Sequence, residues 1–165
     1  MDYMLRSTLK RIAKLLNDQS ITWAVGASVM LNYYGIVQNP RDIDVMVDLK
    51  DIDKLDSILS EVGVKSIGVP DATYKTKVFY EYMIGDIEVD VMGGLCICRA
   101  DKDYLFNFNR DSVGDYMDID GVEVPLAKLT DWYDIYKVLP SREEKVAAIK
   151  EYMEKVNVLI GKAAR

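Results

Sequence analysis

The sequence predicts an α/β (α+β) protein whose sheet-containing core is followed by a helical C-terminal part. Amphipathic helices alternate with short strands in the first half, and the pairs Gly85-Asp86 and Asp120-Gly121 separate alternating strands, as hairpin turns do. Two helical patterns occupy residues 126–165. A chain of 165 residues has the length of one domain, so we expect a single domain with a core of about 1–125 and C-terminal helices of about 126–165.

Helices and strands alternate between the N-terminus and Gly63. The first helix is predicted from the apolar stripe Leu5, Leu9, Ile12 and Leu16. Gly35 and Gly63 follow the next two helical segments, where a glycine commonly ends a helix. The predicted elements are a helix ending near Asn17, a strand at 21–25, a helix at 28–34, a strand at 42–48 and a helix at 52–62.

The second half is predicted to contain two hairpins and two helices. Strands at 77–84 and 87–92 flank Gly85-Asp86, a strand lies at 95–100, residues up to 116 are irregular, and a second hairpin at 117–124 is closed by Pro125. The helix at 126–139 is broken by Pro140. Ser141 and Glu144 predict a capping box at the start of the last helix.

The composition excludes several classes of chemistry. The chain has no histidine, which rules out Ser-His-Asp and Cys-His catalysis and any histidine metal site. Its two cysteines, Cys96 and Cys98, are expected to be reduced thiols in a cytoplasmic protein. No stretch reaches the length of a membrane span, so no membrane association is expected. The net charge of −6 argues against non-specific nucleic-acid binding, which depends on cationic side chains.

Two aspartates, Asp42 and Asp44, are the first candidates for a functional site. On a strand they point to the same side, while Ile43, Val45 and Val47 point to the other. Two carboxylates ~4 Å apart repel by about 4 kcal/mol at an effective dielectric of ~20, and a Mg²⁺ ion between them removes this cost. Ser28 lies at the start of the preceding helix, where backbone N–H groups favour an anion. Metal-binding carboxylates beside a phosphate site indicate phosphoryl or nucleotidyl transfer.

A third carboxylate is expected on a neighbouring strand. Glu88 and Asp90 share one face of the strand at 87–92, and Asp90 is the preferred candidate. Glu88 is either a spare ligand or a solvent-facing residue. The second Asp-Ile-Asp of the chain, residues 118–120, is assigned to a hairpin turn, and Asp48 is assigned to a cap or turn.

This arrangement resembles the nucleotidyltransferase superfamily with the DNA polymerase beta fold, in particular its small bacterial members. Those proteins carry a Gly-Ser turn between a strand and a helix, an Asp-x-Asp on the next strand and a third Asp on a later strand. The positions that match here are Gly26, Ser28, Gly35, Asp42, Asp44 and Asp90. The resemblance implies a mixed, twisted sheet flanked by helices. It also implies that Asp42, Asp44 and Asp90 hold Mg²⁺, with two ions when nucleotide is bound, and that Asp90 helps to activate the acceptor.

The C-terminal helices are similar to those of the family, in which basic residues face the active site. Lys137, Arg142 and Lys145 match such positions, and the resemblance implies that they bind triphosphate together with Gly26 and Ser28. A solvated helix surface is the alternative for these three basic residues. Two positions depart from the family pattern. Ala27 replaces the second glycine of the Gly-Ser turn, and Asn39-Pro40-Arg41 precedes Asp42 in place of Arg-x-Thr.

The expected function is therefore the Mg²⁺-dependent transfer of a nucleoside monophosphate from a nucleoside triphosphate to an acceptor hydroxyl. The acceptor is a small molecule, a protein or an RNA. An acidic surface suits a cationic aminoglycoside, but enzymes that modify antibiotics usually carry a larger C-terminal domain, so this acceptor ranks lower. The alternative is a non-catalytic protein of the same fold that senses nucleotide or binds a partner, as in a toxin–antitoxin pair. Pairing of the last helix with a second copy would give a homodimer.

Overall fold

A computed structural model describes residues 1–69 and 71–163. Its helices are α1 (Tyr3–Asp18), α2 (Ala27–Tyr33), α3 (Ile52–Ser60), α4 (Leu129–Val138) and α5 (Glu143–Ala163). Its strands are β1 (Trp23–Gly26), β2 (Ile43–Val47), β3 (Val64–Ile67), β4 (Val78–Ile84), β5 (Ile87–Gly93), β6 (Leu95–Arg99), β7 (Lys102–Phe106), β8 (Val113–Ile119) and β9 (Val122–Ala127). Short 3₁₀ turns occupy Leu49–Asp51 and Arg110–Ser112. Within the described part of the chain, no helix has the length and apolarity needed to cross a membrane.

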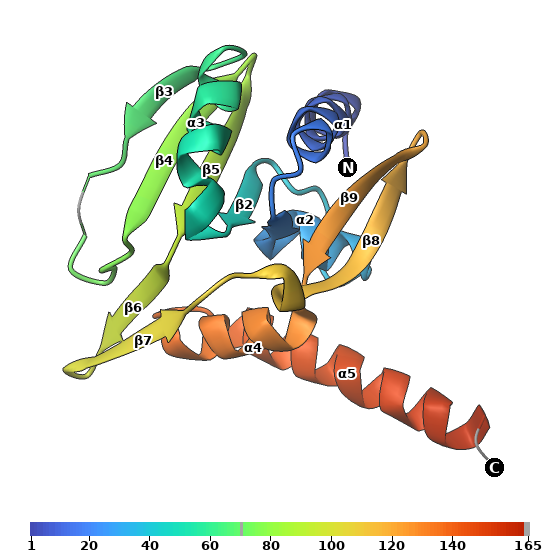
Figure 1. The fold of residues 1–165 in the computed structure, drawn as a ribbon. Helices are drawn as coiled ribbons and strands as arrows, with labels where there is room; N and C mark the ends of the chain where they lie inside the picture. Colours follow the sequence, from blue (N-terminus) through green and yellow to red (C-terminus); the bar gives the residue numbers. More distant parts are fainter. Residues whose placement is uncertain (70, 164–165) are drawn as a thin grey trace.

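The predicted mixed sheet is confirmed, with seven strands in the order β3-β4-β5-β2-β1-β9-β8. Strand β2 runs parallel to β5, and β1 runs parallel to β9, while the other neighbours are antiparallel. Strands β6 and β7 form a separate hairpin, which Figure 1 shows below the main sheet and next to α4. Arg99, at the end of β6, donates hydrogen bonds to the carbonyl oxygens of Lys137 and Val138 and so ties this hairpin to the end of α4.

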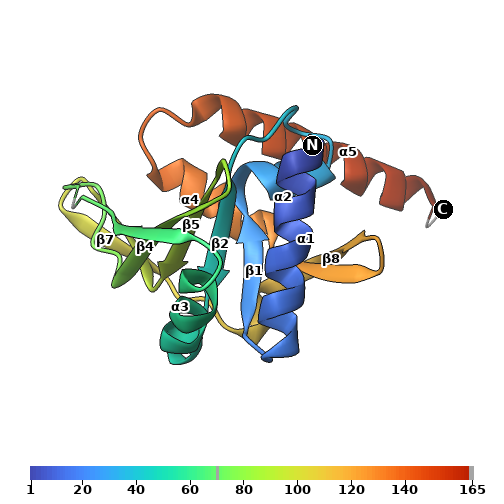
Figure 2. The same cartoon turned by 90° about the horizontal axis from the view of Figure 1, so that it is seen from above.

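The apolar patterns of the sequence form the core as predicted. The α1 stripe of Leu5, Leu9, Ile12 and Leu16 is fully buried, and so are Leu55 and Leu59 of α3. Figure 2 shows both helices on the near side of the sheet. The alternate residues of β2 and β5 that face this core, among them Ile43, Val45 and Val89, have no exposed surface. The aspartates between them therefore point to the opposite side of the sheet.

Both predicted hairpin turns are confirmed. Ile84 pairs with Ile87 around Gly85-Asp86, and Ile119 pairs with Val122 around Asp120-Gly121. Asp120 and Gly121 both have positive φ, as a two-residue turn of this kind requires. The Asp120 carboxylate forms an ion pair with Arg6 at 3.0 Å, which accounts for it structurally. Asp48 is an N-cap, as expected, because its side chain accepts a hydrogen bond from the N–H of Lys50.

Several predicted boundaries are wrong for physical reasons. Pro125 does not close the second hairpin but lies inside β9, paired with Tyr116 in the register of β8 and β9. Strand β9 continues to Ala127, so α4 begins only at Leu129. Ser141 has φ of 59° and lies two residues before α5, so it does not cap that helix. Strands β3 and β7 were not predicted, because most of their side chains are exposed and lack an apolar alternation.

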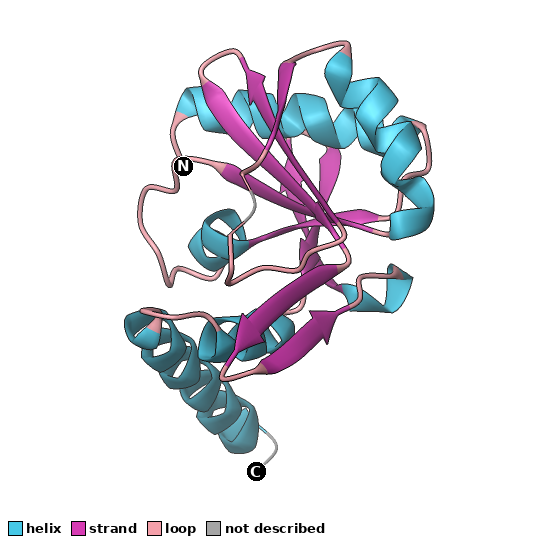
Figure 3. Cartoon of the chain, turned by 90° about the vertical axis from the view of Figure 1, so that its left-hand side faces the viewer, coloured by secondary structure: helices cyan, strands magenta, loops and turns pink. Residues whose placement is uncertain are grey.

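The C-terminal helices lie apart from α1 and α3. Helix α4 packs on α2 and α5, and Figure 3 shows α4 and α5 together on the side of the sheet away from the long N-terminal helix. Helix α5 projects away from the sheet, and Tyr152 contacts Tyr34 with ring centroids 5.5 Å apart. The polar side of β2 and β5 thus faces α4 and the start of α5.

Candidate active site

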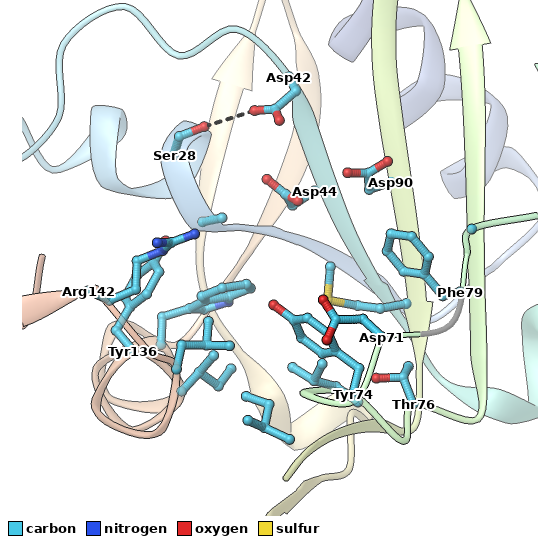
Figure 4. Close-up of a pocket in the computed structure, with 18 of the residues that line it drawn as sticks. Ser28, Asp42, Asp44, Asp71, Tyr74, Thr76, Phe79, Asp90, Tyr136 and Arg142 are labelled. Carbon is cyan, nitrogen blue, oxygen red and sulfur yellow. Dashed lines mark hydrogen bonds between the residues drawn. The ribbon is translucent and has the colours of Figure 1, made fainter. Parts of the chain in front are cut away.

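The pairing of four strands places the acidic residues in one row across the sheet. Gly26 of β1 is opposite Asp44 of β2, Asp44 is opposite Asp90 of β5, and Asp90 is opposite Glu81 of β4. Neighbouring strands lie about 4.8 Å apart, so the three carboxylates occupy adjacent positions. Figure 4 shows Asp44 and Asp90 side by side at the edge of a cleft, with Asp42 above them.

Asp42 lies just before β2, on the same side as Asp44. Its carboxylate accepts a hydrogen bond from the Ser28 hydroxyl at 3.5 Å, drawn as the dashed line in Figure 4. Ser28 is the second residue of α2, and the N-cap of that helix is Gly26, so Ser28 does not act as a side-chain cap. The structure thus brings Ser28, Asp42, Asp44 and Asp90 to one cleft.

Gly26 does not line the cleft but supports one of its walls. Any residue can adopt its φ of −119°, so glycine is needed here because a side chain would lack space and not because of the backbone conformation. A Cβ atom at this position would lie 2.3 Å from Nε1 of Trp132, a buried ring of α4. The structure thus gives Gly26 a packing role, in the close approach of α4 to β1, and does not place it in the cleft, where nucleotide binding was predicted.

Substitution of Gly26 by alanine is expected to lower the free energy of unfolding by about 3 kcal/mol, because the rigid Trp132 ring must move. Urea denaturation of the wild type and of Gly26→Ala measures this loss. The double variant Gly26→Ala/Trp132→Phe supplies the control, since a smaller ring relieves the overlap and makes the two effects non-additive. Equal stability of Gly26→Ala and the wild type would contradict the close packing.

Ala27 has a backbone conformation that favours glycine. Its φ is 50°, in the left-handed region, where an L-residue is less stable by about 1–2 kcal/mol. The family that this sequence resembles has glycine at this position. The turn thus keeps the left-handed conformation that suits glycine, although alanine occupies the position. Ala27 also lines the cleft.

Replacing Ala27 with glycine is expected to stabilise the protein by about 0.5–1 kcal/mol, because relief of the left-handed strain outweighs the entropy that glycine adds to the unfolded chain. The same change widens the cleft next to Ser28 and is expected to tighten nucleotide binding. Thermal melting tests the first effect and calorimetric titration the second. Ala24→Gly, in the buried strand β1, is the control and should destabilise. A lower melting temperature for Ala27→Gly would refute the assignment of strain.

The cleft has a volume of about 620 Å³ and lies between the carboxylates and the C-terminal helices. Trp132 and Tyr136 of α4 line it, together with Arg142 and Lys145. Figure 4 shows Tyr136 and Arg142 across the cleft from Asp44 and Asp90. The segment before β4 closes another side, where Tyr74 forms a bridge with Ile97 of β6. The remaining lining residues are mainly apolar: Ile67, Val69, Phe79, Met92, Leu95, Ile97, Ile135 and Leu139.

Of the three predicted basic residues, the structure brings two to the cleft. Arg142 and Lys145 line it, and the Lys145 ammonium lies 5.1 Å from the centre of the Tyr136 ring. Lys137 points elsewhere. Its ammonium pairs with Asp134 at 3.1 Å and lies over the Tyr133 ring, so the prediction that it binds nucleotide is not supported by this placement.

The carboxylates lie in surroundings that disfavour their charge. Burial, followed by the charges of Asp42 and Asp90, raises the pKa of Asp44 to about 8. Burial, followed by the charges of Glu88 and Glu81, raises the pKa of Asp90 to about 7. Burial also lowers the pKa of Lys145, although the nearby aspartates oppose that shift. The single positive charge of the half-buried Lys145 thus does not offset the negative charges of the acidic row.

The donor set fits a hard divalent cation. Carboxylate oxygens of Glu81, Glu88 and Asp90 all lie within 4.8 Å of one another, and oxygen ligands are those that Mg²⁺ prefers. One oxygen of Asp90 is buried without a hydrogen-bond partner among the described residues. Asp42 and Asp44 are outside this compact group, and of its three members only Asp90 lines the cleft with them. Glu81 was missed by the sequence analysis, although the two-residue turn at 85–86 already pairs it with Asp90.

Comparison with solved structures identifies the fold. No family model matches this chain, and no curated protein matches it in sequence. A candidate nucleotidyltransferase from Thermotoga maritima superposes with a TM-score of 0.69 at 21% identity, over 90% of this chain and 92% of that one. ANT(2″)-Ia, solved with adenylyl-2″-tobramycin, gives a TM-score of 0.61 at 15% identity, over 93% of both chains. The lincosamide antibiotic adenylyltransferase LnuA, solved with lincomycin bound, gives 0.58 at 12% identity, over 88% of this chain and 96% of that one.

The chain therefore has the nucleotidyltransferase fold, as the resemblance implied. Its coverage of ANT(2″)-Ia and LnuA also corrects one expectation from the sequence. Those two proteins are almost fully spanned by this chain, at 93% and 96% of their lengths. The matched regions thus leave no large further C-terminal domain in these two structures.

Proposed function

We propose that this protein is a Mg²⁺-dependent nucleotidyltransferase that moves a nucleoside monophosphate from a nucleoside triphosphate to an acceptor hydroxyl. The observation that carries the proposal is the opposition of two walls across one cleft. Asp42, Asp44 and Asp90 lie on one side, and the basic residues Arg142 and Lys145 lie on the other. A triphosphate fits between the walls, because it needs cationic donors on one side and metal-binding carboxylates on the other.

The residues have distinct proposed roles in this reaction. Asp42 and Asp44 would hold the metal, with Asp90 as the third ligand, and Mg²⁺ when bound would neutralise charge on the phosphates. Arg142 and Lys145 would bind the triphosphate oxygens at the start of α5. Ser28 would orient Asp42 through the hydrogen bond that its hydroxyl donates to that carboxylate.

The transfer step forms one bond and breaks one. The acceptor oxygen bonds to the α-phosphorus, and the bond from that phosphorus to the oxygen bridging to the β-phosphate breaks, so that pyrophosphate leaves. The hydroxyl proton passes to the Asp90 carboxylate, which acts as general base. The position of Asp90 between Asp44 and Glu81 supports this role, because it leaves the carboxylate beside the metal-binding pair.

The acceptor is proposed to be a small molecule with hydroxyl groups. Structural neighbours of this chain were solved with adenylyl-2″-tobramycin and with lincomycin, which makes both antibiotics suitable first probes. Glu81 and Glu88, next to Asp90, add negative charge beside the proposed acceptor position and favour a cationic acceptor.

The test is a transfer assay with each of the four nucleoside triphosphates labelled at the α-phosphate, with Mg²⁺ and with tobramycin or lincomycin as acceptor. Labelled acceptor that requires metal and is lost in Asp44→Asn supports the proposal. Calorimetric titration of Mg²⁺ and nucleotide into the same proteins separates binding from transfer. Saturable binding without transfer to any acceptor would favour a nucleotide sensor, and absence of binding by all four nucleotides would favour a partner-binding protein.

A further inference from the structure

Two aromatic residues of α4 reach the cleft with polar groups that have no partner. Trp132 and Tyr136 are 4% and 3% exposed and lie one helical turn apart, with ring centroids separated by 5.3 Å. The indole N–H of Trp132 and the hydroxyl of Tyr136 have no hydrogen-bond partner among the described residues. A buried donor without a partner destabilises the folded state, so two of them on one wall require an explanation.

Comparable groups elsewhere in the core are paired. The indole N–H of Trp23 donates to Asn17 at 3.0 Å, and the hydroxyl of Tyr82 donates to Asp56 at 2.6 Å. The fold thus provides partners for buried aromatic donors away from the cleft. The partners of Trp132 and Tyr136 are missing only where the side chains line the cleft.

The two donors lie on the helical wall of the cleft, which faces Asp42 and Asp44. Burial, followed by the charge of Asp44, raises the pKa of Tyr136. The Trp132 ring packs so closely on Gly26 that its N–H lies next to the turn leading to Ser28. The Tyr136 ring has the Lys145 ammonium 5.1 Å from its centre, and Figure 4 shows Arg142 beside it. Two neutral donors and two cations therefore converge on one region of the wall, and none of the four offers a strong acceptor in this state.

We propose that Trp132 and Tyr136 are polyphosphate-positioning residues, which donate hydrogen bonds from Nε1 and from the hydroxyl to oxygens of the bound triphosphate. This inference rests on the proposed function. A metal-bound polyphosphate is the ligand that matches four donors on this wall and carboxylates on the facing one. A nucleobase offers donors as well as acceptors and is better matched by the apolar residues Met92, Leu95 and Ile97, which follow Asp90 along the chain.

The proposal predicts opposite effects of Tyr136→Phe on stability and on binding. Removal of an unpaired buried hydroxyl is expected to raise the melting temperature of the metal-free protein by a few degrees. The same variant is expected to bind Mg²⁺-tripolyphosphate and a non-hydrolysable nucleoside triphosphate about 10-fold more weakly, since a hydrogen bond to a charged oxygen is lost. Binding of the nucleoside monophosphate should change little, so the preference for triphosphate over monophosphate falls.

Tyr133→Phe is the matched control, because Tyr133 is a half-buried residue of the same helix that does not line the cleft. It should leave tripolyphosphate binding unchanged, and Trp132→Phe should weaken it as Tyr136→Phe does. If the wild type binds tripolyphosphate and Tyr136→Phe binds it equally well, the inference fails while the proposed function stands. If the wild type binds neither tripolyphosphate nor any nucleoside triphosphate, both the proposed function and the inference fail.

Discussion

Replacement of Asp44 by asparagine is expected to abolish nucleotidyl transfer and at the same time to stabilise the metal-free protein. Asp44 is the central member of the row formed with Gly26 and Asp90, and it accepts no hydrogen bond from the described residues. Asparagine therefore loses no hydrogen bond, while it removes a half-buried carboxylate whose neighbours on the same wall are other carboxylates. The rate should fall about 10³-fold through loss of metal binding, and the free energy of unfolding at pH 7.5 should rise by on the order of 2 kcal/mol.

The second Asp-Ile-Asp of the chain supplies the control. Asp118 of β8 accepts a hydrogen bond from the N–H of Gly121 at 2.9 Å, and an asparagine oxygen accepts it equally well. Asp118→Asn should thus leave both transfer and stability unchanged. Initial rates in the transfer assay and urea denaturation without metal measure the two effects. Retention of transfer by Asp44→Asn would exclude it as a metal ligand, and a lower stability would show that its charge is compensated.

The alternation of apolar and acidic residues along single strands was enough to predict which aspartates form the acidic side of the site. The apolar positions Ile43, Val45 and Val89 are buried, so Asp44 and Asp90 had to emerge on the other face. The same kind of reasoning could also have predicted Glu81 as a member of the site. A two-residue turn at Gly85-Asp86 fixes the register of β4 and β5, and that register pairs Glu81 with Asp90.

The opposite wall could not be predicted in the same way, because it depends on contacts between distant elements. Trp132 reaches the site only because α4 packs on β1 at Gly26, a contact across more than a hundred residues. Lys137 follows Tyr136 directly, and a step of one residue on a helix turns the side chain by about 100°, away from the cleft. Lys145 lines the cleft because α5 starts at Glu143, after a left-handed residue at Ser141 that no sequence pattern indicated.

The metal-free protein is expected to lose stability as the pH rises from about 4 to about 8. In the folded chain, burial and neighbouring carboxylates raise the pKa of Asp44 to about 8 and that of Asp90 to about 7, from ordinary values of 3.8. Across this range the folded state binds more protons than the unfolded state. The contribution of these two groups to the stability of the folded state is therefore highest below about pH 4, and it falls until both carboxyls have ionised. The total loss is on the order of 2–4 kcal/mol, or about 5–10 °C in melting temperature.

Thermal melting in EDTA at pH 5, 6, 7 and 8 measures this loss. Asp56 does not mask it, because hydrogen bonds from Lys65 and Tyr82 lower the pKa of that carboxyl and confine its effect to pH values below 4. The variant Asp44→Asn/Asp90→Asn should give a much flatter profile over the same range, with the smaller slope that Asp131 leaves, since burial raises the pKa of that carboxyl too. Mg²⁺ should restore the melting temperature of the wild type at pH 8, where the carboxylates are ionised and free to bind it, and should do little at pH 5. A wild-type profile that is already flat in EDTA would mean that their surroundings do not destabilise the charged form of these two carboxylates. Mg²⁺ stabilisation that is equal in the double variant would mean that they are not ligands of the metal.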